Sequence, residues 1–212
     1  MEYVAWDIET VPNERAEQYF AMKEYQPDAR LTDPAKILAD VEKKRNAEAT
    51  KAGLYWWTGK VVCICAKASD AVFQMVGDDE ETLLRGFFDW ADARPDSILV
   101  GKSSADFDGP FVTGRVLALD LGVPTCLRRN RTGLISDVDQ IFSHSHACAQ
   151  RSNLENYAWG LGMPGKNGKG SEVANMAAGG KWREIADYCA NDVEITAEMM
   201  RRYLTVYEKR IV

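Results

Sequence analysis

Two carboxylic acids, Asp7 and Glu9, lie two residues apart near the start of the chain. The surrounding residue types predict a β-strand over residues 3–9, and side chains alternate across a strand, so both carboxyls should share one face. Neighbouring acids at the end of an apolar strand repel each other and are costly to remove from water. A divalent cation would remove that cost, and carboxylate oxygens suit Mg²⁺ or Mn²⁺. The alternative is a pair of acids on an exposed edge.

Two later segments carry side chains of the same chemical kind. Asp108 lies where a helix over residues 109–121 is expected to begin, so its alternative role is that of a helix cap. Tyr188 and Asp192 are four residues apart in a segment with helical spacing of apolar residues. That spacing places the phenol and the carboxylate on one helical face, one turn apart. Each group taken singly has a structural explanation as good as a functional one.

The composition limits the class of protein. The chain has 212 residues, of which 46% are apolar and 10% aromatic, which is enough for the core of one soluble domain. The net charge of −6 argues against a protein that coats DNA by bulk electrostatics. It does not argue against an enzyme that meets phosphates through bound cations. No apolar run is long enough to span a bilayer, and the N-terminus leads into a strand rather than a signal peptide.

The five cysteines are an odd number without a Cys-x-x-Cys pair. Cys63 and Cys65 lie on one face of a predicted strand, where core packing is the usual role for cysteine. We therefore expect free thiols in a reducing compartment. This expectation fits a cytoplasmic protein that has no membrane partner.

The pattern of apolar residues predicts an α/β fold. Strands are expected over residues 3–9, 59–66, 71–76, 97–101 and 134–138, and helices over residues 78–93, 109–121 and 181–208. The first three strands could form a meander, and helices alternate with strands after it. This order predicts one domain over residues 1–212, built on a mixed five-stranded sheet flanked by helices.

Residues 16–57 interrupt this order and predict a helical insertion. Asp33 and Pro34 are typical of a helix start, and Gly53 is typical of a position just beyond a helix end. The apolar stripe between them is narrow and the rest is strongly charged. The segment is therefore either an insertion helix packed at the domain edge or a mobile clamp over a substrate groove.

Taken together and in order, the acidic and phenolic residues resemble the three motifs of the DEDD superfamily of 3′–5′ exonucleases, whose fold is related to ribonuclease H. The first motif, Asp-x-Glu, matches Asp7 and Glu9; the second, Asn-x3-Phe-Asp, ends at Asp108 with Ser103 in place of the Asn; the third, Tyr-x3-Asp, matches Tyr188 and Asp192. The resemblance spans residues 3 to about 204.

Tyr188 makes the chain similar to the Tyr branch of that superfamily, which includes the proofreading domains of DNA polymerases. The other branch has a His five residues before the last Asp, where this chain has Asp187. The segment over residues 160–166 resembles a stand-alone phage or bacterial group related to the proofreading domains of family B polymerases. This relationship implies a bacterial cell or a phage-infected host.

The resemblance implies two divalent ions, Mg²⁺ or Mn²⁺, roughly 3.5–4 Å apart. Asp7 would bridge both ions, Glu9 and Asp192 would complete the site that holds the attacking water, and Asp108 would anchor the second ion. Tyr188 would orient the water. An unperturbed phenol has a pKa of about 10 and is a poor general base at neutral pH.

Substrate contacts are expected at Thr10, Ser103, Phe107, Arg128, Arg129, Arg131 and Lys166. Ser103 offers a shorter hydroxyl than the family's Asn, which affects the grip on the terminal nucleotide. The three arginines either contact phosphate or form a solvated loop. Phe107 either stacks on a terminal base or belongs to the core. Lys166 lies in a glycine-rich loop suited to face a phosphate.

These observations predict a metal-dependent 3′–5′ exonuclease that releases nucleoside 5′-monophosphates from the 3′ end of single-stranded DNA. One alternative is an RNA exonuclease on the same scaffold. Another is a non-catalytic module that binds nucleic acid, although the presence of all five motif residues disfavours it. A proofreading role would need a DNA polymerase or another replication or repair partner in trans.

Overall fold

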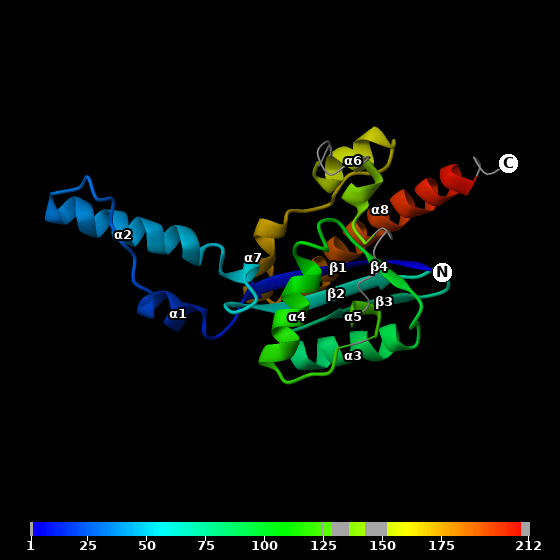
Figure 1. Cartoon of the computed structure of the whole chain (residues 1–212), viewed down its shortest axis with the longest axis horizontal. Coiled ribbons are helices and arrows are strands. Elements are labelled where there is room, and N and C mark those ends of the chain that lie inside the picture. The colour runs from blue at the N-terminus through cyan, green and yellow to red at the C-terminus, as the bar shows by residue number, and fades with distance from the viewer. Residues whose placement is uncertain (1, 124, 129–135, 143–151, 209–212) are drawn as a thin grey trace.

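The structure is a computed structural model that describes residues 2–123, 125–128, 136–142 and 152–208. The strands in this part of the chain are β1 (Tyr3–Pro12), β2 (Gly59–Lys67), β3 (Val72–Val76) and β4 (Ile98–Val100). The α-helices are α1 (Ala16–Met22), α2 (Pro34–Ala49), α3 (Glu80–Asp92), α4 (Asp108–Ala118), α5 (Thr125–Arg128), α6 (Leu154–Gly160), α7 (Val173–Ala178) and α8 (Trp182–Glu208). Short 3₁₀ helices are η1 (Ala52–Leu54), η2 (Val138–Phe142) and η3 (Gly170–Glu172). Figure 1 shows the strands at the centre of the molecule with helices on both sides, so the predicted α/β fold is confirmed.

The described strands form one mixed sheet in the order β3-β2-β1-β4. β2 runs antiparallel to both β1 and β3, which is the predicted meander, and β4 runs parallel to β1. All but the last residue of β2 are buried, as expected for a central strand with a nearly continuous apolar sequence. The sheet therefore buries its two middle strands and places β1 between an antiparallel and a parallel neighbour.

The predicted fifth strand over residues 134–138 is not confirmed. Residues 134 and 135 lie outside the described residues, and Asp137 forms only an isolated parallel bridge with Gly101. Val138 already belongs to η2. Because the described segment leaves the sheet after one bridge, four strands are described where the sequence predicted five.

Side chains of β1 alternate between two cores. Val4, Trp6 and Ile8 pack in the cluster that contains the apolar residues of α3 and α4. Ala5 and Val11 pack in the cluster that contains residues of α7 and α8. Figure 1 shows α3 and α4 on one side of the sheet and α7 and α8 on the other. Asp7 and Glu9 have the parity of Ala5 and Val11, so their side chains face α8.

β1 is longer than predicted, because it continues through Pro12 instead of ending at Glu9. Pairing with β2 extends to Pro12 opposite Gly59, and the register shifts between Glu9 and Thr10. A proline is tolerated here because the strand ends with it. Irregular pairing of this kind often occurs beside functional residues, and here it directly follows Glu9.

The stretch predicted as a helical insertion contains α1, α2 and η1. Figure 1 shows α1 and α2 projecting from one end of the sheet, whereas η1 lies against β1. The side chain of Asp33 caps α2, accepting from the amide of Ala35, as the Asp-Pro sequence predicts. α2 buries no residue, whereas Phe20 of α1 packs against Ala52 at the base of the arm. We call residues 16–54 the arm; its status as an insertion into one domain stays a prediction.

None of the helices in the described residues is both long enough and apolar enough to span a membrane.

Candidate active site

β1 carries the first two candidate residues on the face that packs against α8. As whole residues, Asp7 is partly exposed and Glu9 is 8% exposed. On β2, Cys65 lies opposite Asp7 and Cys63 lies opposite Glu9. The alternative of two acids on an exposed edge does not fit, because their side chains lie on the face of β1 that packs against α8 and Glu9 is 8% exposed.

Asp108 is the first residue of α4 and is 2% exposed. β4 pairs only with residues 3–5 of β1, so the edge of β1 beyond Ala5 is open to the loop that precedes α4. The amide of Ile8 donates a hydrogen bond to Asp108 Oδ1 at 3.3 Å. Because Phe107 occupies the N-cap position without a side-chain bond, Asp108 is not a conventional cap. Its carboxyl instead links α4 to β1 through the bond to the amide of Ile8, the residue between Asp7 and Glu9.

Tyr188 and Asp192 lie one turn apart on α8 and are 5% and 6% exposed. Apolar neighbours on the same helical face, including Ile185 and Val193, pack against β1 and β2. The i, i+4 spacing therefore brings the phenol and the carboxylate to the sheet, as the sequence predicts.

Lys166 joins the two candidate side chains of α8. Its Nζ donates to Tyr188 Oη at 2.8 Å and lies 2.5 Å from Asp192 Oδ2. The same ammonium sits 4.8 Å from the centre of the Tyr188 ring. Burial lowers the pKa of Lys166, but its bonds to Asp192 and Tyr188 outweigh burial and raise the pKa above its usual value. Lys166 is therefore a fixed positive charge in the site.

The loop around Lys166 is held tightly against α8. The amide of Asn167 donates to Asn191 Oδ1 at 3.1 Å, and its side-chain amide donates to the carbonyl of Asp187 at 3.3 Å. A Cβ atom on Gly168 would stand 2.9 Å from Cδ2 of Tyr188. Glycine is needed there because the backbone passes directly over the tyrosine ring.

The four carboxyls perturb one another. Burial raises the pKa of Asp7 well above its usual value, and the charges of Glu9, Asp108 and Asp192 raise it further. Burial and Asp192 raise the pKa of Glu9 to about 8, against the opposing effect of Lys166. Four acids contributed by three distant segments therefore meet in one low-dielectric site.

The other two carboxyls are also protonated more easily than usual. Burial raises the pKa of Asp108 to about 7, although the amide of Ile8 stabilises its charged form. Burial likewise raises the pKa of Asp192, and its bonds to Lys166 and Tyr188 oppose this rise. Lys166 alone cannot balance four ionised carboxylates, so the site favours additional positive charge.

One oxygen in the site lacks a partner. Asp192 Oδ1 is buried without a hydrogen bond, while Oδ2 of the same carboxyl pairs with Lys166. A buried carboxylate oxygen with no donor is costly unless a cation or a water molecule contacts it. The residues therefore fit hard divalent cations, because they offer carboxylate oxygens, one of them unpartnered, at the point where positive charge is needed.

Tyr188 stays protonated at neutral pH. Burial raises its pKa to about 12, although the hydrogen bond from Lys166 lowers it in part. A phenol with this pKa cannot remove a proton from water at pH 7. The structure therefore gives Tyr188 the capacity to orient a bound group through its hydroxyl.

A buried polar network behind Asp108 was not predicted. Asp137 raises the pKa of Asp108 and accepts the amide of Asp139 at 2.8 Å. Asp139 in turn pairs with Lys102 at 3.0 Å and accepts the hydroxyl of Tyr157 at 2.6 Å. The available signal was an acidic residue inside an apolar run, at the segment mistaken for a full strand.

Several predicted substrate residues make contacts within the protein. Ser103 has φ +59°, accepts a bond from Lys102 at 2.8 Å, and shapes the loop that leads to Asp108. Phe107 is partly buried, and the centre of its ring lies 5.5 Å from that of Phe111, which favours a role in the core. The hydroxyl of Thr10 donates to the carbonyl of Gly53 at 2.6 Å, at the base of the arm.

The predicted arginine cluster cannot be placed. Arg129 and Arg131 lie outside the described residues, as does the side chain of Arg128 at the end of α5. Among the described substrate candidates, Lys166 forms an ion pair with one of the four carboxyls, that of Asp192. The roles of all seven predicted residues in substrate binding remain predictions.

A model of a family described as predicted 3′–5′ exonucleases related to the exonuclease domain of PolB matches residues 59–207. The chain belongs to this family. The resemblance to 3′–5′ exonucleases is thereby confirmed. The matched residues include Asp108, Lys166, Tyr188 and Asp192, whereas Asp7, Glu9 and the whole arm precede them.

A solved family B DNA polymerase from the hyperthermophilic archaeon Pyrobaculum calidifontis shares the fold. The two structures superpose with a TM-score of 0.59 at 18% sequence identity, over 96% of this chain and 24% of the polymerase chain. At this identity the likeness concerns the fold alone, and the chain spans about a quarter of the polymerase's length. No curated protein matches the chain.

Proposed function

We propose that this exonuclease-family protein is a metal-dependent enzyme that removes nucleoside 5′-monophosphates from the 3′ end of single-stranded DNA. The observation that carries the proposal is the meeting of Asp7, Glu9, Asp108 and Asp192 in one site. Burial raises the pKa values of these carboxyls and so disfavours their ionised forms, which supports a site completed by cations. Membership of the family supports the exonuclease reaction, and the chemistry of the ligands supports the metals.

The four carboxyls would hold two divalent ions, Mg²⁺ or Mn²⁺. Asp7 would be a central ligand, because its carboxyl is close enough to the other three acids for their charges to raise its pKa. Glu9, Asp192 and Asp108 would supply the other carboxylate ligands, and the Ile8 amide fixes the orientation of the Asp108 carboxyl. Divalent ions bound in this way would activate a water molecule and stabilise the leaving oxygen.

Tyr188 and Lys166 provide the other functional groups. Tyr188 keeps its proton, so its hydroxyl can hold a water molecule or a phosphate oxygen in place for reaction. Lys166 already touches both Tyr188 and Asp192, and its charge can neutralise a phosphate that enters the site. Both groups therefore act by positioning and by charge, and neither serves as a general base.

The test is a ladder assay on 5′-labelled single-stranded DNA with Mg²⁺, Mn²⁺ or EDTA. We expect shortening from the 3′ end that is lost in EDTA and in Asp7→Ala. Matched RNA, run in parallel, fixes the substrate class, since the 2′-hydroxyl is what separates the two polymers at a site. Intact DNA with degraded RNA would replace the DNA proposal by the RNA one. Both polymers bound but intact would support a non-catalytic module instead.

A polymerase or other replication partner acting in trans remains part of this proposal. Pull-down of a partner through the catalytically inactive Asp7→Ala variant tests it separately from the chemistry.

A further inference from the structure

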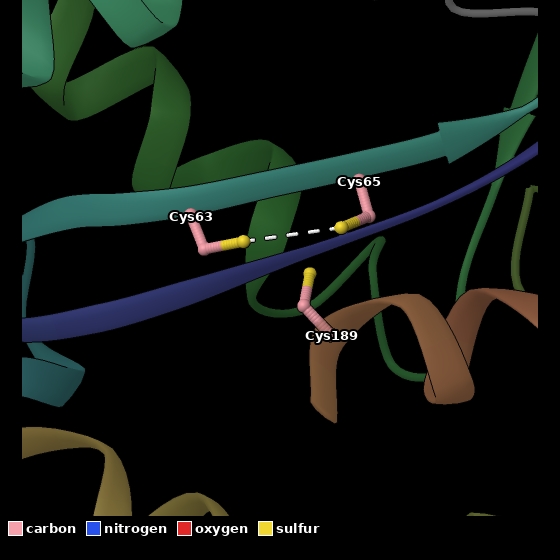
Figure 2. A group of neighbouring side chains, drawn as sticks. All are labelled: Cys63, Cys65 and Cys189. Atoms are coloured by element: carbon pink, nitrogen blue, oxygen red, sulfur yellow. Dashed lines mark hydrogen bonds between the residues drawn. The ribbon is translucent and has the colours of Figure 1, made fainter. Parts of the chain in front are cut away.

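Three thiols form a compact cluster directly behind the carboxylates. Cys63 and Cys65 lie on β2 and Cys189 lies on α8, with exposed fractions of 0%, 2% and 0%. Figure 2 shows the three sulfur atoms directed toward one another in the space between the strand and the helix. The cluster arises because alternate residues of β2 face α8, and Cys189 is on the helical face that packs against that strand.

The spacing of the sulfur atoms matches that of thiolates around a single ion. The Sγ atoms of Cys63 and Cys65 are 3.8 Å apart, and all three Sγ atoms lie within 4.8 Å of one another. A zinc–thiolate bond is about 2.3 Å long, which places two thiolates on a tetrahedral ion about 3.8 Å apart. The sulfur atoms of the two cysteines on β2 are therefore already as far apart as two thiolates bound to one soft cation.

A disulfide is a poorer account of the same cluster. Its sulfur atoms must approach to about 2.05 Å with a defined torsion, whereas Cys63 and Cys65 project side by side from one strand. Full burial also keeps an oxidant away from the sulfur atoms. An ion can instead be captured while the chain folds, because metal binding and folding are coupled.

We propose that Cys63, Cys65 and Cys189 form a site for one thiophilic cation of the Zn²⁺, Cd²⁺ or Cu⁺ class. Soft sulfur ligands select such ions, whereas Mg²⁺ and Mn²⁺ prefer the carboxylate oxygens next door. The site is independent of the nuclease reaction. Its bound ion joins β2 to α8 and therefore stabilises the packing that carries Tyr188 and Asp192.

Cys189 also connects the thiol cluster to the carboxylates. Its Sγ lies 3.5 Å from the carbonyl oxygen of Asp7. It also lies within 4.8 Å of carboxylate oxygens of Asp7 and Glu9. A mixed site made of these two acids and one thiol is therefore the principal rival, and the experiment must separate the two.

The experiment uses a chain with Cys126→Ser and Cys148→Ser, so that only the three clustered thiols remain of the five cysteines. The reduced, metal-stripped protein is titrated with Cd²⁺, and the thiolate-to-cadmium charge-transfer absorption in the ultraviolet is followed. We expect one Cd²⁺ per chain, no displacement by excess Mg²⁺, and a higher Tm for the loaded protein. Cys63→Ala and Cys65→Ala should each weaken binding by at least tenfold, whereas Asp7→Asn should keep the absorption band.

The absence of a band in the folded protein would overturn the proposal. So would an unchanged Cd²⁺ affinity in Cys63→Ala, or a band that is lost in Asp7→Asn, because both results assign the ion to the mixed site. Circular dichroism checks the fold of each variant. Cadmium NMR on the chain with all three thiols needs no further substitution: a resonance typical of three sulfur ligands supports the site, and one typical of oxygen ligands contradicts it.

Discussion

Asp192 has two oxygens in different situations, one paired with Lys166 and the other buried without a partner. In the absence of metal, Lys166 is the positive charge that the described residues place beside Asp192. Removing one partner of a buried ion pair leaves the other uncompensated. The stability of the metal-free protein should therefore depend on Lys166 more than that of the metal-loaded protein.

We predict that Lys166→Ala lowers the free energy of unfolding by about 1–3 kcal/mol in EDTA, and by less in saturating Mg²⁺. The reason is that bound cations would supply the charge that the lysine provides in their absence. Urea unfolding with and without Mg²⁺ measures the difference. Lys169→Ala, an exposed lysine in the same loop, is the matched control and should change stability by no more than about 0.5 kcal/mol. An equal loss in both conditions would contradict this role.

The raised carboxyl pKa values also predict how stability varies with pH. The pKa of Glu9 rises from 4.5 to about 8, and that of Asp108 from 3.8 to about 7. Between the unfolded-state and folded-state pKa values of each carboxyl, the folded protein binds more protons than the unfolded chain. Stability therefore falls as the pH rises from about 4 to about 8. The metal-free protein should therefore have a lower Tm at about pH 8.5 than at about pH 5.

Saturating Mg²⁺ should flatten this dependence, because ligated carboxylates are ionised in the folded state as well. Glu9→Gln and Asp108→Asn should flatten it in EDTA, each by removing one titrating group. Thermal melts across that pH range measure both effects. A Tm in EDTA that rises steadily over the window would refute the assignment of buried, proton-holding carboxyls.

At the scale of elements, the motif spacings predicted which faces would meet. Strand alternation correctly placed Asp7 and Glu9 on one face, and the helical i, i+4 spacing placed Tyr188 and Asp192 together. The extension of β1 to Pro12 depends on its partner β2, and no local pattern shows it. The missing fifth strand has a similar origin, since an apolar run cannot by itself distinguish a full strand from a single bridge before a 3₁₀ turn.

The loop that carries Lys166 depends on close packing against α8. Gly168→Ala would place a Cβ atom 2.9 Å from the Tyr188 ring, so the loop must lift. We predict about a tenfold loss in kcat/KM on single-stranded DNA, equivalent to about 1.4 kcal/mol. Gly165→Ala is the control, because its Cβ would meet no atom closer than 3.8 Å. Equal activity of the two variants in steady-state assays would show that the loop does not position Lys166 for catalysis.

At the scale of the whole molecule, the site is assembled from segments about 80 to 180 residues apart, while the arm extends away from the sheet (Figure 1). Sequence order revealed the assembly because each motif has a characteristic spacing. The contacts of Lys166 and Asp137 could not be foreseen, since they depend on how loops fold over α8 and α4. The arm illustrates the same limit: its helix α2 was predicted, but its lack of any buried residue was not.

Because α2 buries no residue, the arm should contribute little to the stability of the remainder. Lys23 and Glu48 form an ion pair at 2.5 Å, so a short Gly-Ser linker can replace residues 24–47. We predict a Tm within a few degrees of the full chain. A large loss would show that the arm is part of the main folding unit. Unchanged activity of this variant on long single strands would exclude the clamp hypothesis.

The central claim is that the four carboxyls form the nuclease centre, and Asp192→Asn tests it most directly. The amide keeps the size of the side chain but removes the charge that two divalent cations require. The measurement is the initial rate of nucleoside 5′-monophosphate release from single-stranded DNA in Mg²⁺, with circular dichroism as the check on folding. We predict a loss of about a thousandfold or more, about 4 kcal/mol in the barrier, with the fold retained. A folded variant that releases mononucleotides at the wild-type rate would contradict the account.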